Sequence, residues 1–173
     1  MSTSNEAATE SAEREFTITR VFNAPRDLVW KAYTEAERLM QWWGPKGVTM
    51  RVAKMDLRPG GRFHYCYQMP DGNEMWGVFD YREVVAPERL VFTNAFSDAE
   101  GTIVRASFSA EWPLEILNTQ IFAEHESKTT ITMRAVPYKA TAAEHKIFEG
   151  AFASLQQGIK GTLDQLEAYL ARA

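Results

Sequence analysis

The sequence is poor in the residues that build disulfides and metal sites. It has a single cysteine, Cys66, so it forms no internal disulfide and no cysteine-based zinc site. Its three histidines, His64, His125 and His145, are too far apart for a local metal-binding motif. We therefore expect no metal and no other cofactor, and we expect a reducing compartment, the cytoplasm.

Basic charge and long apolar runs are lacking as well. Lysine and arginine number 19 against 23 aspartates and glutamates, a net charge of −4, so no nucleic-acid-binding surface is expected. No stretch reaches the roughly 18 apolar residues of a membrane-spanning helix, which predicts a protein without membrane insertion. The pair Gly60-Gly61 precedes a predicted strand rather than a helix, so it does not indicate a phosphate-binding loop.

The chain is long enough for one domain with a substantial core. It has 173 residues, of which 45% are hydrophobic and 24% charged, values typical of a globular protein. Residues 1–15 are small, polar and acidic, and we expect a disordered tail there because little apolar surface is available for burial. Residues 16–173 are predicted to form a single folded domain.

One strand, two short helices and a series of further strands are predicted in that order. Alternating apolar residues predict a strand over 16–22, and the proline that follows stands in the first turn of a predicted helix. A second helix starts at Thr34, which has capping-box spacing to Glu37, and stops at Gly44-Pro45. Turn-forming residues then separate predicted strands at 48–57, 62–69, 74–85, 89–96, 103–111, 115–124 and 128–136.

The C-terminal segment is predicted to be one long amphipathic helix. Thr141 and Glu144 form a second capping box, and apolar residues recur at spacings of three and four from about 141 to 171. Such a helix is about 45 Å long and needs a wide surface to cover its apolar side. The antiparallel sheet is the only wide partner, so we predict an α+β fold with a curved sheet wrapped around this helix. A close approach to the sheet or a local bend is expected at three glycines, Gly150, Gly158 and Gly161.

Five short motifs resemble one known superfamily. In chain order they are Gln41-Trp42-Trp43-Gly44-Pro45, Arg58-Pro59-Gly60-Gly61-Arg62-Phe63, Pro87-Glu88-Arg89-Leu90-Val91-Phe92-Thr93, Trp112-Pro113-Leu114-Glu115 and Gly161-Thr162-Leu163-Asp164-Gln165-Leu166-Glu167-Ala168-Tyr169-Leu170. Together they resemble the START-like (SRPBCC) superfamily, and within it the branch named for homologues of the heat-shock protein 90 ATPase activator. The resemblance runs from about Phe16 to the C-terminus.

The resemblance implies the helix-grip fold, with an apolar cavity between the sheet and the long helix. Members of the superfamily bind lipids, hormones and polyketides, and some are cyclases or dehydratases. One departure lies in the last helix, where many relatives resemble Gln-Gly-Trp. Here Gln157-Gly158 is followed by Ile159, so a branched aliphatic side chain is expected where relatives carry an indole.

Candidate cavity residues come from the aromatic strands and from the apolar side of the long helix. Strand alternation places Phe63, Tyr65 and Tyr67 on one face and His64 and Cys66 on the other. Tyrosine hydroxyls and an asparagine amide would orient a ligand, although the same aromatic residues would equally fill a solid core. The candidates are Phe63, Tyr65, Tyr67, Trp76, Phe79, Tyr81, Asn94, Phe148, Phe152, Leu155 and Ile159, with Trp42 and Trp43 at the rim.

Three functions are compatible with these residues. The leading hypothesis is binding of a small apolar or aromatic molecule in the cavity, without catalysis. The second is a polyketide cyclase-like or dehydratase-like enzyme, which needs a group such as His64 or a tyrosine in the cavity with a shifted pKa. The third is a co-chaperone that stimulates a heat-shock ATPase, suggested only by the name of the family branch. A homodimer is left open.

Overall fold

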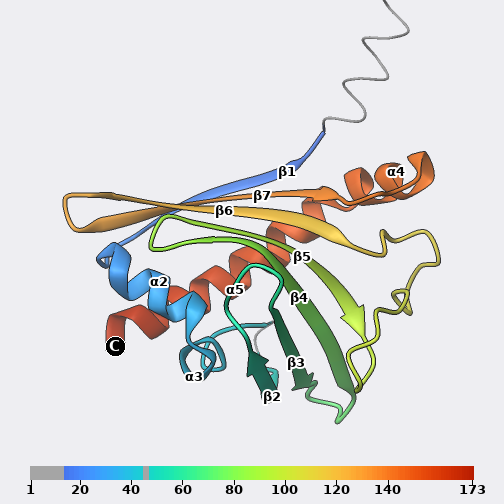
Figure 1. The fold of residues 1–173 in the computed structure, drawn as a ribbon, viewed down its shortest axis with the longest axis horizontal. Coiled ribbons are helices and arrows are strands. Elements are labelled where there is room, and N and C mark those ends of the chain that lie inside the picture. Colours follow the sequence, from blue (N-terminus) through green and yellow to red (C-terminus); the bar gives the residue numbers. More distant parts are fainter. Residues whose placement is uncertain (1–13, 45–46) are drawn as a thin grey trace, which may run out of the picture.

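The computed structural model describes residues 14–44 and 47–173 (Figure 1). One strand is followed by two short helices, six further strands of an open antiparallel sheet and two C-terminal helices. In chain order they are β1 (Phe16–Phe22), α2 (Arg26–Thr34), α3 (Ala36–Leu39), β2 (Thr49–Met55), β3 (Arg62–Gln68), β4 (Glu74–Val85), β5 (Arg89–Ser97), β6 (Ile116–His125), β7 (Lys128–Pro137), α4 (Ala142–Gly150) and α5 (Phe152–Arg172).

The predicted α+β fold is confirmed. The sheet has seven strands in the order β1-β7-β6-β5-β4-β3-β2, and every neighbouring pair is antiparallel. Register shifts between Met50 and Val52 and between Tyr81 and Glu83 introduce irregularities of the kind that bend a strand. Figure 1 shows the resulting curve, with α5 crossing its inner side and with α2 and α3 at one end of that helix.

Most of the predicted tail lies outside the described residues, which begin at Arg14. The two described residues of that segment contact the domain. Arg134 Nε donates a hydrogen bond of 3.0 Å to Glu15, and the guanidinium of Arg14 lies 3.7 Å from the carboxylate of Glu149. The predicted domain therefore has ordered contacts just before its expected start at Phe16.

The predicted single C-terminal helix is wrong in one respect, because the structure has two helices. The capping box of Thr141 and Glu144 starts α4 as predicted. The helical path then breaks at Ala151, whose ψ of 3° departs from helical geometry, directly after Gly150. A Cβ added at Gly150, Gly158 or Gly161 would meet no described atom within 4 Å. The expected close approach to the sheet is therefore wrong at these glycines, and a bend occurs only beside Gly150.

The predicted strand over 103–111 is also wrong. The chain there forms a loop with one isolated bridge, between Ser97 and Ile103. β6 pairs with β5 only as far as Asn94, so just the last residues of β5 have a free edge on that side. There the loop makes the Ser97–Ile103 bridge and one hydrogen bond of 3.0 Å from the Val104 N–H to the carbonyl oxygen of Phe96, and the pairing goes no further. The loop is held instead by Arg105, which donates to the carbonyl oxygen of Trp112 at 3.1 Å and to Glu144 at 2.6 Å.

The core consists of two clusters of buried side chains. The larger cluster joins α2, α3 and the C-terminal half of α5 to the inner face of the sheet. The smaller one contains Phe16, Ala106, Trp112, Ile116 and Phe148, at the end of the sheet near α4. Ile18 and Ile159 contact both clusters. Among the described residues, no helix has the length and apolar character needed to cross a membrane.

Candidate ligand-binding cavity

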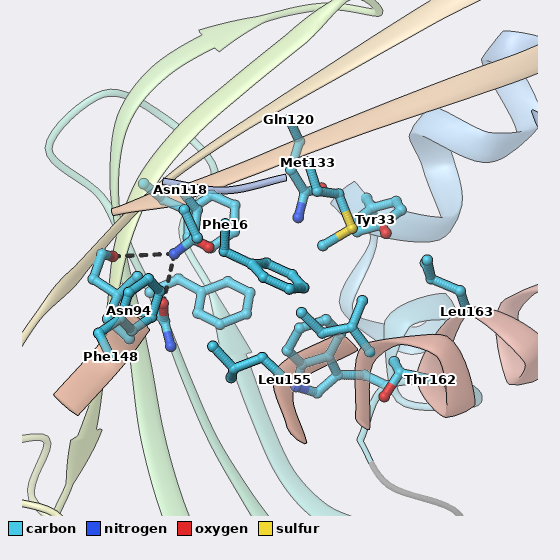
Figure 2. A pocket seen from close by; sticks show the side chains of 16 residues that line it. Phe16, Tyr33, Asn94, Asn118, Gln120, Met133, Phe148, Leu155, Thr162 and Leu163 are labelled. Carbon is cyan, nitrogen blue, oxygen red and sulfur yellow. Dashed lines mark hydrogen bonds between the residues drawn. The ribbon is translucent and has the colours of Figure 1, made fainter. Parts of the chain in front are cut away.

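A cavity of about 220 Å³ lies between the inner face of the sheet and α5 (Figure 2). It separates the two core clusters, because Phe16, Ile116 and Phe148 line it from the smaller cluster and Phe79 and Phe92 from the larger. Its apolar lining is Phe16, Trp43, Phe79, Phe92, Ile116, Met133, Ala135, Phe148, Leu155, Ile159 and Leu163, and its polar lining is Tyr33, Asn94, Asn118, Gln120 and Thr162.

The secondary structure explains why these side chains face inward. On β6, Ile116, Asn118 and Gln120 stand at every second position and therefore share one face of the strand. On α5, Leu155, Ile159, Thr162 and Leu163 follow the helical spacing of three to four residues. The side chains from α5 and from β6 face each other across the cavity, as Figure 2 shows for Leu155 of α5 and Gln120 of β6.

Two polar side chains in the cavity wall are buried without a hydrogen-bond partner among the described residues. They are Tyr33 through its hydroxyl and Gln120 through Oε1, with exposed fractions of 4% and 1%. Burial raises the pKa of the Tyr33 hydroxyl far above its ordinary value, so this group stays neutral. An unsatisfied buried polar group costs about 1–3 kcal/mol of folding free energy, so a partner for either group would be stabilising.

Two amide side chains of the cavity wall, Asn94 and Asn118, are hydrogen-bonded to each other. Asn118 Nδ2 donates to Asn94 Oδ1 at 2.5 Å and to the carbonyl oxygen of Ile116 at 3.0 Å. The residues come from adjacent strands, β5 and β6, whose register places Asn94 opposite Ile116. This pair therefore forms a fixed polar strip on the cavity wall, and Figure 2 shows it on the opposite side of the cavity from Tyr33.

A second chamber of about 210 Å³ adjoins the first, since Trp43, Asn94 and Ile116 line both. Tyr65 and Tyr67 line this second chamber rather than the first. The Tyr67 hydroxyl donates to Met75 Sδ at 2.8 Å. Burial raises the pKa of both tyrosine hydroxyls above the ordinary value, so they are neutral around pH 7.

The structure divides the predicted cavity residues into three groups: those that line a chamber, those that lie in the core, and one on the outer face of the sheet. In the first group, the first chamber is lined by Trp43, Phe79, Asn94, Phe148, Leu155 and Ile159, and the second chamber by Trp43, Tyr65, Tyr67 and Asn94. Buried or partly buried in the core, outside the linings of both chambers, are Trp42, Phe63, Tyr81 and Phe152. The third group is Trp76 alone.

Two predicted tryptophan positions need correction. Trp76 lies on the outer face of β4, because alternation places it opposite to Met75 and Gly77, and its ring lies 5.1 Å from that of His64. Trp42 is not at a rim. It is only 2% exposed, and its Nε1 donates to the carbonyl oxygen of Ala32 at 3.1 Å, so it fixes α3 against α2.

His64, which the enzyme hypothesis would place in the cavity, also lies outside it. His64 and Cys66 share the outer face of β3, as alternation predicts. His64 Nε2 lies 3.2 Å from the carbonyl oxygen of Asp98 in the loop that follows β5. Burial, together with the nearby Glu74 carboxylate, raises the pKa of the Cys66 thiol, which keeps the sulfur protonated.

The sequence interpretation missed Tyr33, Asn118 and Gln120. Tyr33 lies on the buried side of α2, and nothing in the helical pattern of apolar residues singles out its hydroxyl. On β6 the periodicity is ambiguous, because both alternating faces mix polar and apolar residues. One signal in the sequence points to the two amides. Asn118 and Gln120 stand at alternate positions with Phe122, so they share the strand face on which this phenylalanine is buried in the core.

Comparison with known proteins agrees with this architecture. The sequence model of the family described as "Activator of Hsp90 ATPase homolog 1-like protein" matches residues 23–171. None of the curated proteins compared with the chain matches it.

Several solved structures are similar over most of their length. A protein from Nitrosomonas europaea is 28% identical, covering 93% of this chain and 96% of its own, with a TM-score of 0.74. A protein from Staphylococcus epidermidis is 28% identical, covering 91% and 90%, with a TM-score of 0.71. A protein from Mycobacterium smegmatis is 27% identical, covering 89% and 88%, with a TM-score of 0.71. The expected helix-grip architecture is thus shared with these proteins.

Proposed function

The chain belongs to the family of Activator of Hsp90 ATPase homolog 1-like proteins, and from this premise we propose that it binds a small, neutral, apolar or aromatic molecule between its sheet and α5. The observation that carries the proposal is the cavity itself. It is surrounded by eleven apolar side chains and is bounded by the long C-terminal helix on one side and the sheet on the other.

The size of the cavity indicates a small ligand. An apolar cavity of about 150 Å³ in another protein is large enough to bind benzene. The first chamber, at about 220 Å³, is larger than that, but it is smaller than the about 300–1,000 Å³ typical of drug-sized ligands. A single substituted aromatic ring therefore fits the first chamber, and a substituent directed past Trp43 would reach the second.

The lining also indicates a neutral ligand. Among the described residues that line the first chamber there is no Asp, Glu, Lys, Arg or His. Burying an ion without a partner costs far more free energy than burying a neutral polar group. A carboxylate or ammonium group on the ligand would therefore have to remain outside this chamber.

The proposal is tested with propylbenzene and indole as neutral aromatic probes. Binding is followed by the NMR signals of the Leu155 and Ile159 methyl groups and by thermal unfolding. A probe at about 100 times its dissociation constant is expected to stabilise the fold by about 2.7 kcal/mol. If neither probe changes these NMR signals or stabilises the fold, the proposal is contradicted.

A matched pair of variants locates the binding. Ile159→Phe places a larger side chain in the wall of the first chamber and is expected to weaken propylbenzene binding at least severalfold. Ile147→Phe makes the same change on α4 at a residue that is 38% exposed and outside the cavity lining. It is expected to leave binding unchanged, and an equal loss in both variants would place the binding elsewhere.

The description of the family names a further activity, activation of an Hsp90 ATPase, and this is a second candidate function. It is tested by measuring the ATPase rate of an Hsp90-type chaperone with and without the chain. From the cavity proposal we expect no change in that rate. A stimulation that persists in Ile159→Phe would favour the co-chaperone function over ligand binding.

The cyclase-like or dehydratase-like alternative has less support. It required His64 or a tyrosine with a shifted pKa to face the cavity. His64 lies on the outer face of β3, and the pKa of Tyr33 is shifted upward, away from the range useful for proton transfer near pH 7. We therefore argue for binding rather than catalysis.

A further inference from the structure

We infer that the ligand carries a hydroxyl group, held at the end of the first chamber by Tyr33 and Gln120, which we call the polar end. The inference rests on the proposed function and specifies the chemical class of its ligand, a neutral aromatic alcohol or phenol. It is carried by two buried polar atoms in the chamber wall, the Tyr33 hydroxyl and Gln120 Oε1, which have no partner among the described residues.

The two side chains of the polar end both neighbour Phe122 and line the same chamber. The ring of Tyr33 packs edge-on against that of Phe122, with ring centroids 5.3 Å apart. Phe122 follows Gln120 by two residues on β6, so both side chains leave the same face of the strand. Figure 2 shows Tyr33 and Gln120 on the same side of the chamber, opposite Asn94 and Phe148.

The chemistry of the two atoms selects a hydroxyl. Gln120 Oε1 only accepts hydrogen bonds, whereas the Tyr33 hydroxyl both donates and accepts. A ligand hydroxyl donates to Gln120 Oε1 and accepts from Tyr33, so one group satisfies both. A ligand carbonyl or ether oxygen accepts from Tyr33 but leaves Gln120 Oε1 without a donor.

The other polar side chains of the chamber already make hydrogen bonds within the protein. The Nδ2 group of Asn118 already donates to Asn94 Oδ1 and to the carbonyl oxygen of Ile116. The Thr162 oxygen lies 3.3 Å from the carbonyl oxygens of both Gly44 and Gly158, and its single hydroxyl proton is donated to one of them. The polar end is therefore the part of the wall where a hydroxyl adds hydrogen bonds to side chains that have none.

The test compares two probes of almost the same shape, 4-propylphenol and propylbenzene, by isothermal titration calorimetry at pH 7. Two added hydrogen bonds strengthen binding, so the wild-type protein is expected to bind the phenol about tenfold more tightly than propylbenzene. In the double variant Tyr33→Phe/Gln120→Met the two dissociation constants are expected to become equal, while propylbenzene still binds.

Tyr81→Phe is the matched control. Tyr81 is buried to a similar extent, 3% exposed against 4% for Tyr33, but it lines neither chamber. Removing its hydroxyl is expected to leave the preference for the phenol unchanged. Circular dichroism and thermal unfolding confirm that each variant is folded before binding is measured.

The possible outcomes separate this inference from the proposed function. If wild-type protein binds both probes equally, the polar end does not recognise a hydroxyl, and the inference fails while cavity binding stands. If the preference persists in the double variant, another group recognises the hydroxyl and the assignment to Tyr33 and Gln120 is wrong. If neither probe binds, the proposed function fails and the inference fails with it.

Discussion

The ring of Tyr65 lies directly over Gly77, its partner in the antiparallel register of β3 and β4. A Cβ added to Gly77 would stand 2.5 Å from the Tyr65 hydroxyl oxygen and 2.6 Å from its Cζ. The absence of a side chain on one strand thus makes room for an aromatic ring on the next. This contact sets the position of Tyr65 in the wall of the second chamber.

The first prediction concerns this contact. Gly77→Ala is expected to destabilise the protein by about 1–3 kcal/mol, because the new methyl group forces the buried ring out of place. In a Tyr65→Ala background the same change is expected to be neutral or stabilising, because alanine is favoured over glycine inside a strand. Urea unfolding of the four proteins gives the coupling energy of the double-mutant cycle. Equal costs in both backgrounds would show that the steric contact is unimportant.

The second prediction contrasts two amides on the same face of β6. Asn118→Leu removes the donor to Asn94 Oδ1 and is expected to cost about 1–3 kcal/mol of stability. Gln120→Met removes an acceptor without a partner among the described residues and is expected to leave stability unchanged or to raise it by about 1 kcal/mol. Both values come from chemical denaturation in the absence of ligand. A larger loss for Gln120→Met than for Asn118→Leu would contradict this assignment of hydrogen bonds.

Strand alternation and turn signals were enough to predict most of the sheet from the sequence. In β3 the aromatic residues occupy one phase and His64 and Cys66 the other, so the inner face is unambiguous. In β4 the residues around Trp76 are apolar in both phases, and a large aromatic side chain was assigned to the cavity although its phase is that of the outer face. For Trp76, the size of the side chain suggested the inner face of β4, whereas strand periodicity correctly indicates the outer face.

The features that the sequence could not supply depend on contacts between distant segments. The strand predicted over 103–111 has suitable residues but pairs with β5 only at the Ser97–Ile103 bridge, which only the three-dimensional arrangement reveals. Likewise, the polar end joins Tyr33 of α2 to Gln120 of β6, and no local pattern relates these two positions. The apolar cavity was inferred from family resemblance, but its polar groups required the three-dimensional arrangement.

The third prediction concerns the start of α4, where Glu144 is buried. The backbone N–H of Thr141 and the guanidinium of Arg105 lower the pKa of the Glu144 carboxyl below its ordinary value of 4.5. In the unfolded chain this carboxyl takes up a proton near its ordinary pKa, whereas in the folded protein it remains ionised to lower pH. Its contribution to stability is therefore complete above the ordinary pKa and is lost as pH falls through the lower, folded-state value.

Glu144→Gln measures this contribution. The difference in unfolding free energy between wild type and variant is expected to be largest above about pH 5 and to shrink below that pH. Urea unfolding at a series of pH values from 3 to 7 provides the curve. The matched control is Glu149→Gln, on the same helix but outside the capping box. A difference that stays constant over this range would mean that the ionised carboxylate has no special role in the cap.

The fourth prediction concerns the pH dependence of ligand binding. Among the described residues, the titratable groups in the walls of the two chambers are Tyr33, Tyr65 and Tyr67, and burial raises the pKa of each hydroxyl above its ordinary value of 10. All three therefore keep their protons from acidic to mildly alkaline pH. The dissociation constant of the uncharged probe propylbenzene is expected to be the same at every pH between 5 and 9. Calorimetric titration across this range checks it, with Tyr67→Phe expected to give an equally flat profile. A step in affinity with a midpoint between pH 5 and 8 would instead reveal an acid or base coupled to the cavity, and would favour the enzyme hypothesis over binding alone.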